Sequence, residues 1–278
     1  MANCGDSSLH VPLTIAIGRN AAPAERARFS PRNRLLAALP QDALSRLHPH
    51  LQFVPLAHGE VICEADAPAS RVYFVETGMV SLVAVFQDRT TAEMATVGRE
   101  GMVGVGAILG GASALGRHVA PMHGAALAIE VSRFRSLLRE SEPLRAACGA
   151  YAEAFLREAL QTAACNSVHM VEERCARWLL MSHDRSDSDT ITLTQEYLAE
   201  MLGVCRSTVT IAAGALQRAG LIRYRRGAIT VVDRSGLEAV SCECYRVIRD
   251  HYERLLPRTY ERHRLLRIDE QPFSRTLA

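Results

Sequence analysis

The sequence has no lysine, so all 32 of its basic residues are arginine, a bias that we attribute to codon usage. It also lacks an apolar run of about 18 residues, which excludes an ordinary membrane-spanning helix and a membrane partner. A signal peptide pattern and C-x-x-C pairs are both missing, and these absences argue against a secreted disulfide framework and against a spaced metal site. We therefore expect a cytoplasmic protein with free thiols and no bound metal.

Length and charge set the next bounds. The chain has 278 residues, and 48% of them are hydrophobic, so it is long enough for two globular domains with a sizeable core. Its formal net charge is only +2. A polyanionic partner such as DNA would therefore have to meet a local cluster of arginines, because the overall charge is too small to attract it.

The segment 193–220 has the pattern of two short helices joined by a tight turn. Thr194 can cap the first helix, because its hydroxyl can accept a hydrogen bond from an N–H group of the first turn. Gly203 supplies the turn, since glycine adopts left-handed backbone angles at little cost. The second helix is predicted to begin near Arg206, with an inward stripe at helical spacing made of Val209, Ala212, Ala213 and Leu216. This arrangement is typical of a helix-turn-helix, which lays its second helix in the major groove of DNA.

A predicted two-stranded wing follows, with strands over residues 221–224 and 229–232. From Val204 to Val232 there are five arginines and no acidic residue, so this unit has a local charge of +5. Such a surface favours binding of double-stranded DNA through the release of counterions. Arg206 could donate to a guanine edge, while short polar groups could contact phosphates. The predicted DNA-binding residues are Thr194, Gln195, Arg206, Ser207, Thr208, Thr210, Gln217, Arg225 and Arg226.

Short strands and glycine turns dominate residues 52–131, which predicts a β-barrel or jelly roll. Ser141 then caps a long predicted helix over residues 141–167. This helix is apolar on more than one side, so it needs two surfaces to bury against. One would be the barrel, and we expect the other to be the same helix of a second subunit, which would make the protein a homodimer. A further single helix is predicted after the wing, over residues 235–256.

A small barrel, a long helix and a winged helix-turn-helix in this order resemble the Crp/Fnr superfamily of bacterial transcription regulators. The resemblance covers about residues 32–250 and is carried by the segments 193–199, 201–204 and 220–222 in the C-terminal unit, and by 73–78, 98–104, 163–166 and 177–180 before it. It implies an α+β protein whose N-terminal barrel senses a signal that the long dimerisation helix transmits. It also implies a dimer that binds a two-fold symmetric DNA site with half-sites about one helical turn apart. RNA polymerase is a further candidate partner.

The start of the second helix departs from the family pattern. Many relatives have Ser-Arg-Glu at this point, whereas this chain has Cys205, Arg206 and Ser207. The acidic partner for a cytosine amino group is therefore missing, and the family's best-known half-site cannot be carried over.

The signal is not fixed by the resemblance. Cyclic-nucleotide binders of the family have Gly-Glu before an apolar residue, followed by Arg-Ser or Arg-Thr. Here Glu100 precedes Gly101, and Arg117 is followed by His118, so cyclic nucleotide is disfavoured and no cofactor is identified. These four residues, Glu100, Gly101, Arg117 and His118, are nevertheless the candidate ligand-binding residues.

Metal-based sensing is also disfavoured by the sequence. An iron–sulfur sensor needs four cysteine ligands with several near the N-terminus, yet only Cys4 lies in the first 60 residues. His118 and His123 could bind a metal, but they lack a third ligand. Cys242 and Cys244 could form a redox pair; on a helix, however, residues i and i+2 point apart, so we favour ordinary core thiols.

The predicted domains are a mobile tail (1–29), a cyclic-nucleotide-binding-like barrel (30–140), a dimerisation helix (141–167), a winged helix-turn-helix (168–236) and a C-terminal helix with a tail (237–278). The leading hypothesis is a sequence-specific transcription regulator. The alternative is a ligand-sensing module whose C-terminal unit binds a protein partner. An enzyme is disfavoured, because the sequence has no G-x-S-x-G, P-loop, H-E-x-x-H or kinase-like motif.

Overall fold

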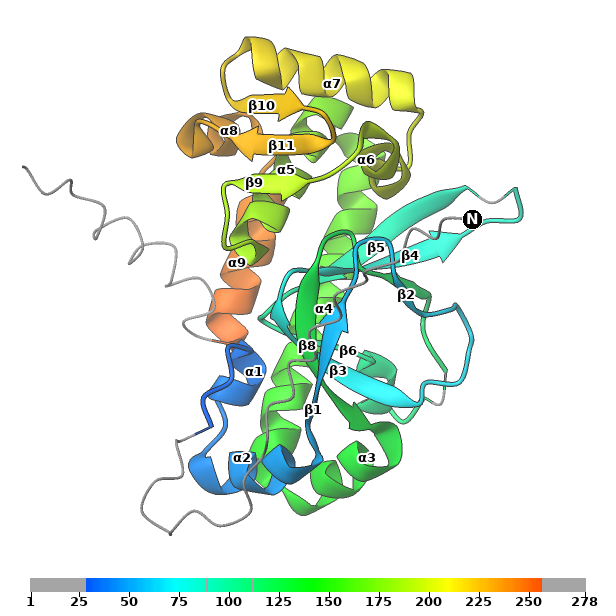
Figure 1. Ribbon diagram of the computed structural model, residues 1–278, viewed down its shortest axis with the longest axis vertical. Coiled ribbons are helices and arrows are strands. Elements are labelled where there is room, and N and C mark those ends of the chain that lie inside the picture. The colour runs from blue at the N-terminus through cyan, green and yellow to red at the C-terminus, as the bar shows by residue number, and fades with distance from the viewer. Residues whose placement is uncertain (1–28, 89, 112, 257–278) are drawn as a thin grey trace, which may run out of the picture. The chain divides into compact units, whose positions relative to one another are not determined.

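The structure is a computed structural model that describes residues 29–88, 90–111 and 113–256 (Figure 1). The predicted N-terminal tail, apart from its last residue, and the chain after Leu256 lie outside the described residues. Among the described residues, no helix is long and apolar enough to cross a membrane.

The first described elements are two short helices and a 3-10 turn, α1 (Arg34–Ala37), α2 (Gln41–Leu47) and η1 (His48–His50). Asn33 begins α1, because its side-chain oxygen accepts a hydrogen bond from the N–H of Leu36 at 3.0 Å. The amide of the same buried side chain donates to the carbonyls of Val75 and Gly101, at 2.9 and 2.7 Å. One asparagine thus caps the helix and fastens it to the neighbouring strands.

The N-terminal domain consists of two antiparallel sheets of four strands each. The first has the order β1–β8–β3–β6, with strands Gln52–Leu56, Gly124–Glu130, Arg71–Thr77 and Met102–Val103. The second has the order β2–β7–β4–β5, with strands Val61–Cys63, Arg117–Val119, Val80–Val85 and Thr91–Val97. A short turn, η2 (Val105–Ala107), follows β6. The sheets do not join into a closed barrel, so the jelly-roll alternative of the prediction is the one that the structure confirms.

Two helices leave the jelly roll in succession, α3 (Val131–Glu140) and α4 (Glu142–Val168). The ring of Phe134 packs edge-on against Phe74 of the first sheet, with 6.1 Å between ring centroids. Ser141 caps α4 as predicted, since its hydroxyl accepts from the N–H of Leu144. The buried side of α4 faces the jelly roll, and the hydroxyl of Tyr151 donates to the carbonyl of Met102 at 2.8 Å.

The C-terminal unit contains α5 (Val171–Arg185), α6 (Gln195–Leu202) and α7 (Arg206–Arg218) around a three-stranded sheet. The sheet has the order β10–β11–β9, with strands Ile222–Arg225, Ala228–Val231 and Thr190–Thr192. The prediction of a two-stranded wing was therefore wrong in one respect, because β9 adds a third strand beside β11. The predicted four-residue connection between the wing strands also shrinks to Arg226 and Gly227, whose φ angles of 45° and 77° are the left-handed pair of a tight hairpin turn.

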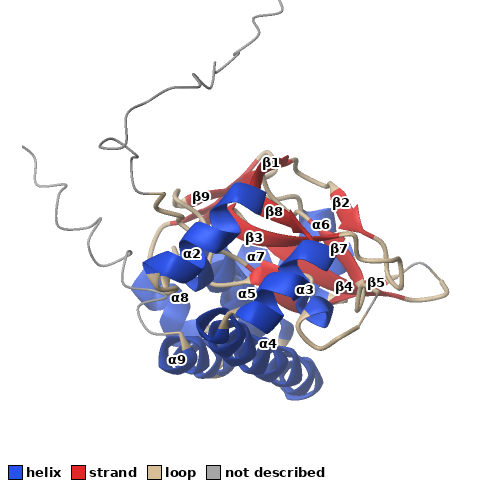
Figure 2. Ribbon diagram, turned by 90° about the horizontal axis from the view of Figure 1, so that it is seen from below, coloured by secondary structure: helices blue, strands red, loops and turns tan. Residues whose placement is uncertain are grey.

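The predicted single helix after the wing is broken into two, α8 (Arg234–Val240) and α9 (Cys244–Leu255). Asp233 caps α8 by accepting from the N–H of Gly236, and the break comprises residues 241–243. Helix α9 lies beside α4, as Figures 1 and 2 show, and the hydroxyl of Tyr252 donates to Glu158 of α4 at 2.8 Å. The break therefore turns the chain back from the wing towards the long helix.

Candidate functional site

Helices α6 and α7 form the helix-turn-helix that the sequence predicts. Thr194 caps α6, since its hydroxyl accepts from the N–H of Tyr197 at 3.1 Å. Gly203 ends α6 with a φ of 62°, a left-handed angle that a side chain would strain. The predicted inward stripe is confirmed as core, because the side chains that share it are all buried: Val209, Ala212, Ala213 and Leu216.

The first turns of α7 place polar side chains at the surface. Arg206 is mostly exposed, with 63% of its side-chain area accessible, and its guanidinium lies 3.3 Å from the carboxylate of Glu196. The hydroxyl of Thr210 donates to the side-chain oxygen of Gln195 at 2.9 Å. Residues from the start of α6 and the start of α7 are thus brought together into one exposed polar edge.

Cys205 lies at the N-terminal end of α7 and contacts two of the predicted DNA-binding residues. Its sulfur is 3.3 Å from the hydroxyl of Ser207 and 3.1 Å from that of Thr208. These hydrogen bonds, first that of Ser207 and then those of Thr208, lower the pKa of the exposed Cys205 thiol to about 7. A thiol that is partly ionised near pH 7 therefore lies at the N-terminal end of α7.

The wing carries its positive charge outward. Arg223, Arg225 and Arg226 are exposed, and no acidic side chain of the described residues forms an ion pair with any of the three. Gln217, in contrast, is used internally, since its side-chain oxygen accepts from the N–H of Tyr224 at 2.7 Å and so holds α7 to the wing. Of the predicted DNA-binding set, Gln217 is therefore already engaged in the fold, while Arg225 and Arg226 remain available to phosphates.

The C-terminal unit also contacts the jelly roll directly. Trp178 of α5 donates from its indole N–H to Glu93 of β5 at 2.9 Å, and Ser81 donates to the same carboxyl at 2.6 Å. Burial raises the pKa of Glu93 to about 7, against the opposing effect of these two donors. Gly203 approaches the same strand, since a Cβ atom there would lie 3.4 Å from Ala92. A displacement of β5 would thus also move the turn between α6 and α7.

The jelly roll contains a small cavity that is partly open to solvent. Small and apolar side chains make up most of its lining, among them Ile62, Leu82, Val103, Val105 and Ala114. His118 also lines it, and burial lowers the pKa of this imidazole to about 4, so the ring is neutral near pH 7. Its Nδ1 atom has no hydrogen-bond partner among the described residues. The lining is therefore mostly apolar, and His118 contributes to it a buried nitrogen without a partner in the described part of the chain.

The four predicted ligand-binding residues are not brought together. Only His118 lines the cavity, whereas Arg117 forms an ion pair with Glu64 at 2.7 Å. Glu100 is buried and accepts from the guanidinium of Arg185 at 2.6 and 2.9 Å. Gly101 packs against the ring of Tyr151 of α4. The predicted ligand contacts of Glu100 and Gly101 thus have no support in this geometry, because both residues belong to the junction between the jelly roll and the helices.

Two family models match the chain. The cyclic nucleotide-binding domain matches residues 53–141, and the Crp-like helix-turn-helix domain matches residues 173–240. Together they take in more than half of the chain, in the order that the structure shows. The chain belongs to the Crp/Fnr superfamily. It is therefore a transcription regulator of the Crp/Fnr type with a DNA-binding helix-turn-helix domain.

Solved structures agree with this fold. FixK2 from Bradyrhizobium japonicum is 19% identical and has a TM-score of 0.58, with 69% of this chain and 98% of that chain covered. The c-di-GMP-responsive global regulator CLP of Xanthomonas campestris is 17% identical, with a TM-score of 0.57 and coverages of 69% and 99%. A CRP-family transcriptional regulator from Thermus thermophilus is 20% identical, with a TM-score of 0.58 and coverages of 68% and 96%. No curated protein matches the chain.

The structure of this Crp/Fnr regulator assembles one group of side chains that the sequence analysis did not connect. Cys165, His169, Cys242 and Cys244, hereafter the Cys₃His cluster, have ligand atoms that all lie within 4.8 Å of one another. The expectation of no metal site rested on the missing C-x-x-C pairs, and the argument that Cys242 and Cys244 point apart assumed one unbroken helix. The helix break invalidates that argument, because Cys242 lies in the break and Cys244 begins α9. The i, i+4 spacing of Cys165 and His169 was a signal that could have been noticed.

Proposed function

We propose that this Crp/Fnr regulator is a homodimer that recognises a two-fold symmetric DNA site through α7 and the wing, under the control of the jelly roll. The observation that carries the proposal is the exposed polar start of α7 next to the unpaired arginines of the wing. Arg206 would donate to a guanine edge. Thr194, Ser207 and Thr208 lie at helix N-termini, where short polar groups and N–H groups would meet phosphates.

Dimerisation is supported by the outer face of α4. Its inner face is buried, yet Leu156 and Leu160 on the other side are 58% and 62% exposed. The exposed Ala163 follows three residues after Leu160, and spacings of three and four residues share one side of a helix, so one apolar stripe follows α4. Two copies of α4 packed along this stripe would bury both leucines and present two α7 helices to successive major grooves, about 34 Å apart.

The cavity supports an uncharged small molecule as the signal. A cyclic phosphate needs a free cation, but Arg71 in the lining is paired with Glu130 at 2.8 Å and the neutral His118 has no charge to offer. An uncharged ligand with a single hydrogen-bonding group would satisfy the unpaired Nδ1 of His118 and bury apolar area.

A route from the jelly roll to the DNA-binding unit is built from buried charges. Arg185 at the end of α5 donates to Glu100 and to Thr96 of β5, the latter at 2.7 Å. Glu158 of α4 accepts from the N–H and the hydroxyl of Thr96, at 3.0 and 2.7 Å. Because Thr96 bonds to α4 and α5 at once, a shift of β5 would have to move one of the two helices or break one of these hydrogen bonds.

Selection from a random pool of double-stranded DNA, with purified protein at fixed moderate salt, tests the proposal. We expect an inverted repeat whose half-sites lie about one helical turn apart. Light scattering should show that the wild-type protein is a dimer. The double variant Leu156→Glu/Leu160→Glu should be a monomer that no longer selects a repeat. The control is Ser132→Glu, which adds a charge at an exposed position of α3 and should remain dimeric.

The outcomes separate the parts of the proposal. An intact dimer that selects no DNA sequence, whether or not a small molecule occupies the cavity, would contradict DNA recognition. It would favour a protein partner for the C-terminal unit. A double variant that stays dimeric would contradict the α4 interface alone. The contact with RNA polymerase, the cytoplasmic location and the domain boundaries stay predictions.

A further inference from the structure

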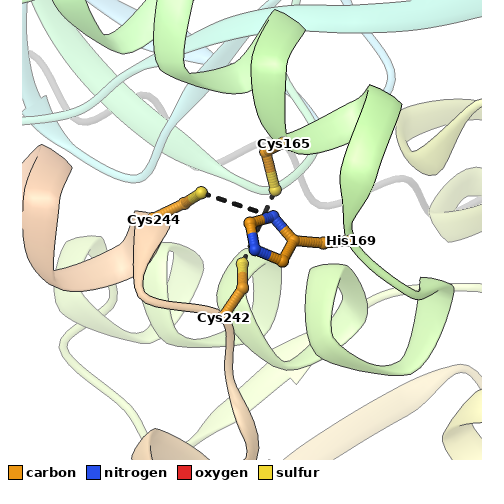
Figure 3. Close-up of side chains that lie close together, drawn as sticks. All are labelled: Cys165, His169, Cys242 and Cys244. Atoms are coloured by element: carbon orange, nitrogen blue, oxygen red, sulfur yellow. Dashed lines mark hydrogen bonds between the residues drawn. The ribbon is translucent and has the colours of Figure 1, made fainter.

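The Cys₃His cluster lies where three parts of the chain meet. Cys165 is in the last turn of α4 and His169 is the residue that ends this helix. Cys242 lies in the break between α8 and α9, and Cys244 is the first residue of α9. In Figure 3 the three sulfur atoms and the imidazole ring point towards one another from these separate segments. The cysteines are buried and His169 is half-buried, so the cluster is shielded but not sealed from solvent.

Two distances inside the cluster are close to the edges of one tetrahedral cation site. The sulfur atoms of Cys165 and Cys242 are 3.5 Å apart, and the sulfur of Cys244 is 3.6 Å from Nδ1 of His169. Zn–S bonds of about 2.3 Å and Zn–N bonds of about 2.0–2.1 Å give tetrahedral edges of about 3.8 Å between two sulfurs and about 3.6 Å between sulfur and nitrogen. A disulfide would need about 2.05 Å between the sulfurs, which is far shorter than the separation here.

Neighbouring groups orient the ligands as they do at metal centres. The Nε2 atom of His169 lies 3.1 Å from the carboxylate of Glu243, which holds the proton on Nε2 and leaves Nδ1 facing the thiols. The side-chain amide of Gln161 donates to the sulfur of Cys244 at 3.0 Å. A carboxylate behind a ligating histidine and an N–H donor to a ligating sulfur both fix the direction of the lone pairs.

Two buried arginines supply the charge that a thiolate site requires. Arg174 and Arg177 are 7% and 3% exposed, and neither forms an ion pair with a carboxylate of the described residues. The Nε atoms of both lack a hydrogen-bond partner in this part of the chain. Arg177 lies close enough to interact electrostatically with the sulfurs of Cys165 and Cys242, and Arg174 interacts with the same two sulfurs. A buried cation is costly without a nearby anion, and three thiolates around a divalent cation would provide one net negative charge.

We propose that Cys165, His169, Cys242 and Cys244 bind one Zn²⁺ ion in a closed tetrahedral site that fastens the end of α4 to the start of α9. Three thiolates and an imidazole favour zinc over the hard cations magnesium and calcium, which prefer oxygen ligands. Four protein ligands leave no open position for a substrate, so the site is structural and not catalytic.

The position of the site gives it a consequence for DNA binding. Residues 169 and 170 connect α4 to α5, and α8 and α9 follow the wing, so the cluster joins the two ends of the DNA-binding unit to the long helix. Resting on the proposed function, we infer that zinc holds this unit in the orientation that lets both α7 helices of a dimer reach DNA. Removal of zinc should therefore lower DNA affinity without abolishing dimerisation through α4.

The first test is the metal content of the full-length protein, purified under reducing conditions without chelators. We expect one zinc per chain by elemental analysis, and Co²⁺ in its place should give the intense visible and sulfur-to-metal charge-transfer bands of a tetrahedral thiolate site. Cys165→Ser and Cys242→Ser should lose the metal, whereas Cys205→Ser, an exposed thiol outside the cluster, should keep it. Glu243→Gln changes a mostly exposed side chain and leaves all ligands in place, so it should fold and bind zinc about 10–100-fold more weakly.

The possible results are decisive. Wild-type protein that takes up neither Zn²⁺ nor Co²⁺, that contains iron with sulfide, or that has a Cys165–Cys242 disulfide would overturn the zinc site. Zinc at one per chain with DNA affinity unchanged after its removal would overturn the link to DNA binding. Absence of sequence-specific DNA binding with zinc bound would count against the proposed function and leave the metal site standing, because the metal is measured without DNA.

Discussion

The arginines of the wing and those at the junction between the jelly roll and the helices have opposite environments. Arg223, Arg225 and Arg226 are exposed and have no acidic partner among the described side chains. Arg185, in contrast, is 2% exposed and contacts Glu100 and Thr96. One residue type thus serves as an outward charge for a polyanion at one place and as an internal clamp at the other, and the difference lies in which acids the fold brings near.

The largest effect is expected from removing the internal clamp. Arg185→Met should lower the free energy of unfolding by about 3–5 kcal/mol, because Glu100 would stay buried without its cation and Glu158 would be deprived of a charge 3.8 Å away. Urea unfolding followed through the fluorescence of Trp178, the single tryptophan of the chain, measures it.

A second substitution sharpens this experiment. Arg185→Met combined with Glu100→Gln should recover part of the loss, since the variant no longer buries the unpaired Glu100 charge. The control is Arg225→Ala, an exposed position where the change should stay within about 0.5 kcal/mol. An Arg185→Met protein as stable as wild type would mean that the buried pair with Glu100 does not contribute to folding stability. Arg185 would then not be an internal clamp.

The next effect concerns the arginine at the start of α7. Arg206→Ala should weaken binding to the selected site by about 1–3 kcal/mol and relax the preference at one base position of each half-site. Folding stability should hardly change, because the pair with Glu196 is exposed at both ends. Arg46→Ala on α2, also exposed, is the matched control for loss of one charge. Unaltered affinity in titrations of labelled DNA would remove Arg206 from the recognition surface.

Local features of the sequence predicted the fold best. Thr194, Ser141 and Gly203 each act within a few residues, so the caps and the turn could be placed from the chain alone. The third strand of the wing could not, because β9 is short and exists through its pairing with β11, some 40 residues away. The break between α8 and α9 was missed for a similar reason, since helical spacing continues across it and only the packing of α9 on α4 requires the chain to turn.

The candidate sites show the same limit. The exposed face of α7 follows from the inward stripe, so Arg206 and Thr210 could be assigned to it from the sequence alone. The partners of Glu100 and Cys165 lie 85 and 77 residues away along the chain, at Arg185 and Cys242. No periodicity or motif spans such distances. Glu100 was accordingly assigned to a ligand site, and the Cys₃His cluster was not recognised as a group.

The smallest effect is expected at the wing, and it separates phosphate contacts from base contacts. Arg225→Ala with Arg226→Asn removes two exposed charges, with asparagine chosen because residue 226 has a φ of 45° that alanine would strain. Affinity should fall by a similar factor for the selected site and for random DNA, and the slope of log affinity against log salt should decrease by about 1 for each phosphate that the variant no longer neutralises. Binding measured over a series of KCl concentrations gives this slope. Arg206→Ala, in contrast, should mainly change the base preference and should have less effect on the slope. A double variant with the wild-type slope would show that the wing arginines face solvent in the complex. The positive charge that neutralises DNA phosphates would then have to come from α7.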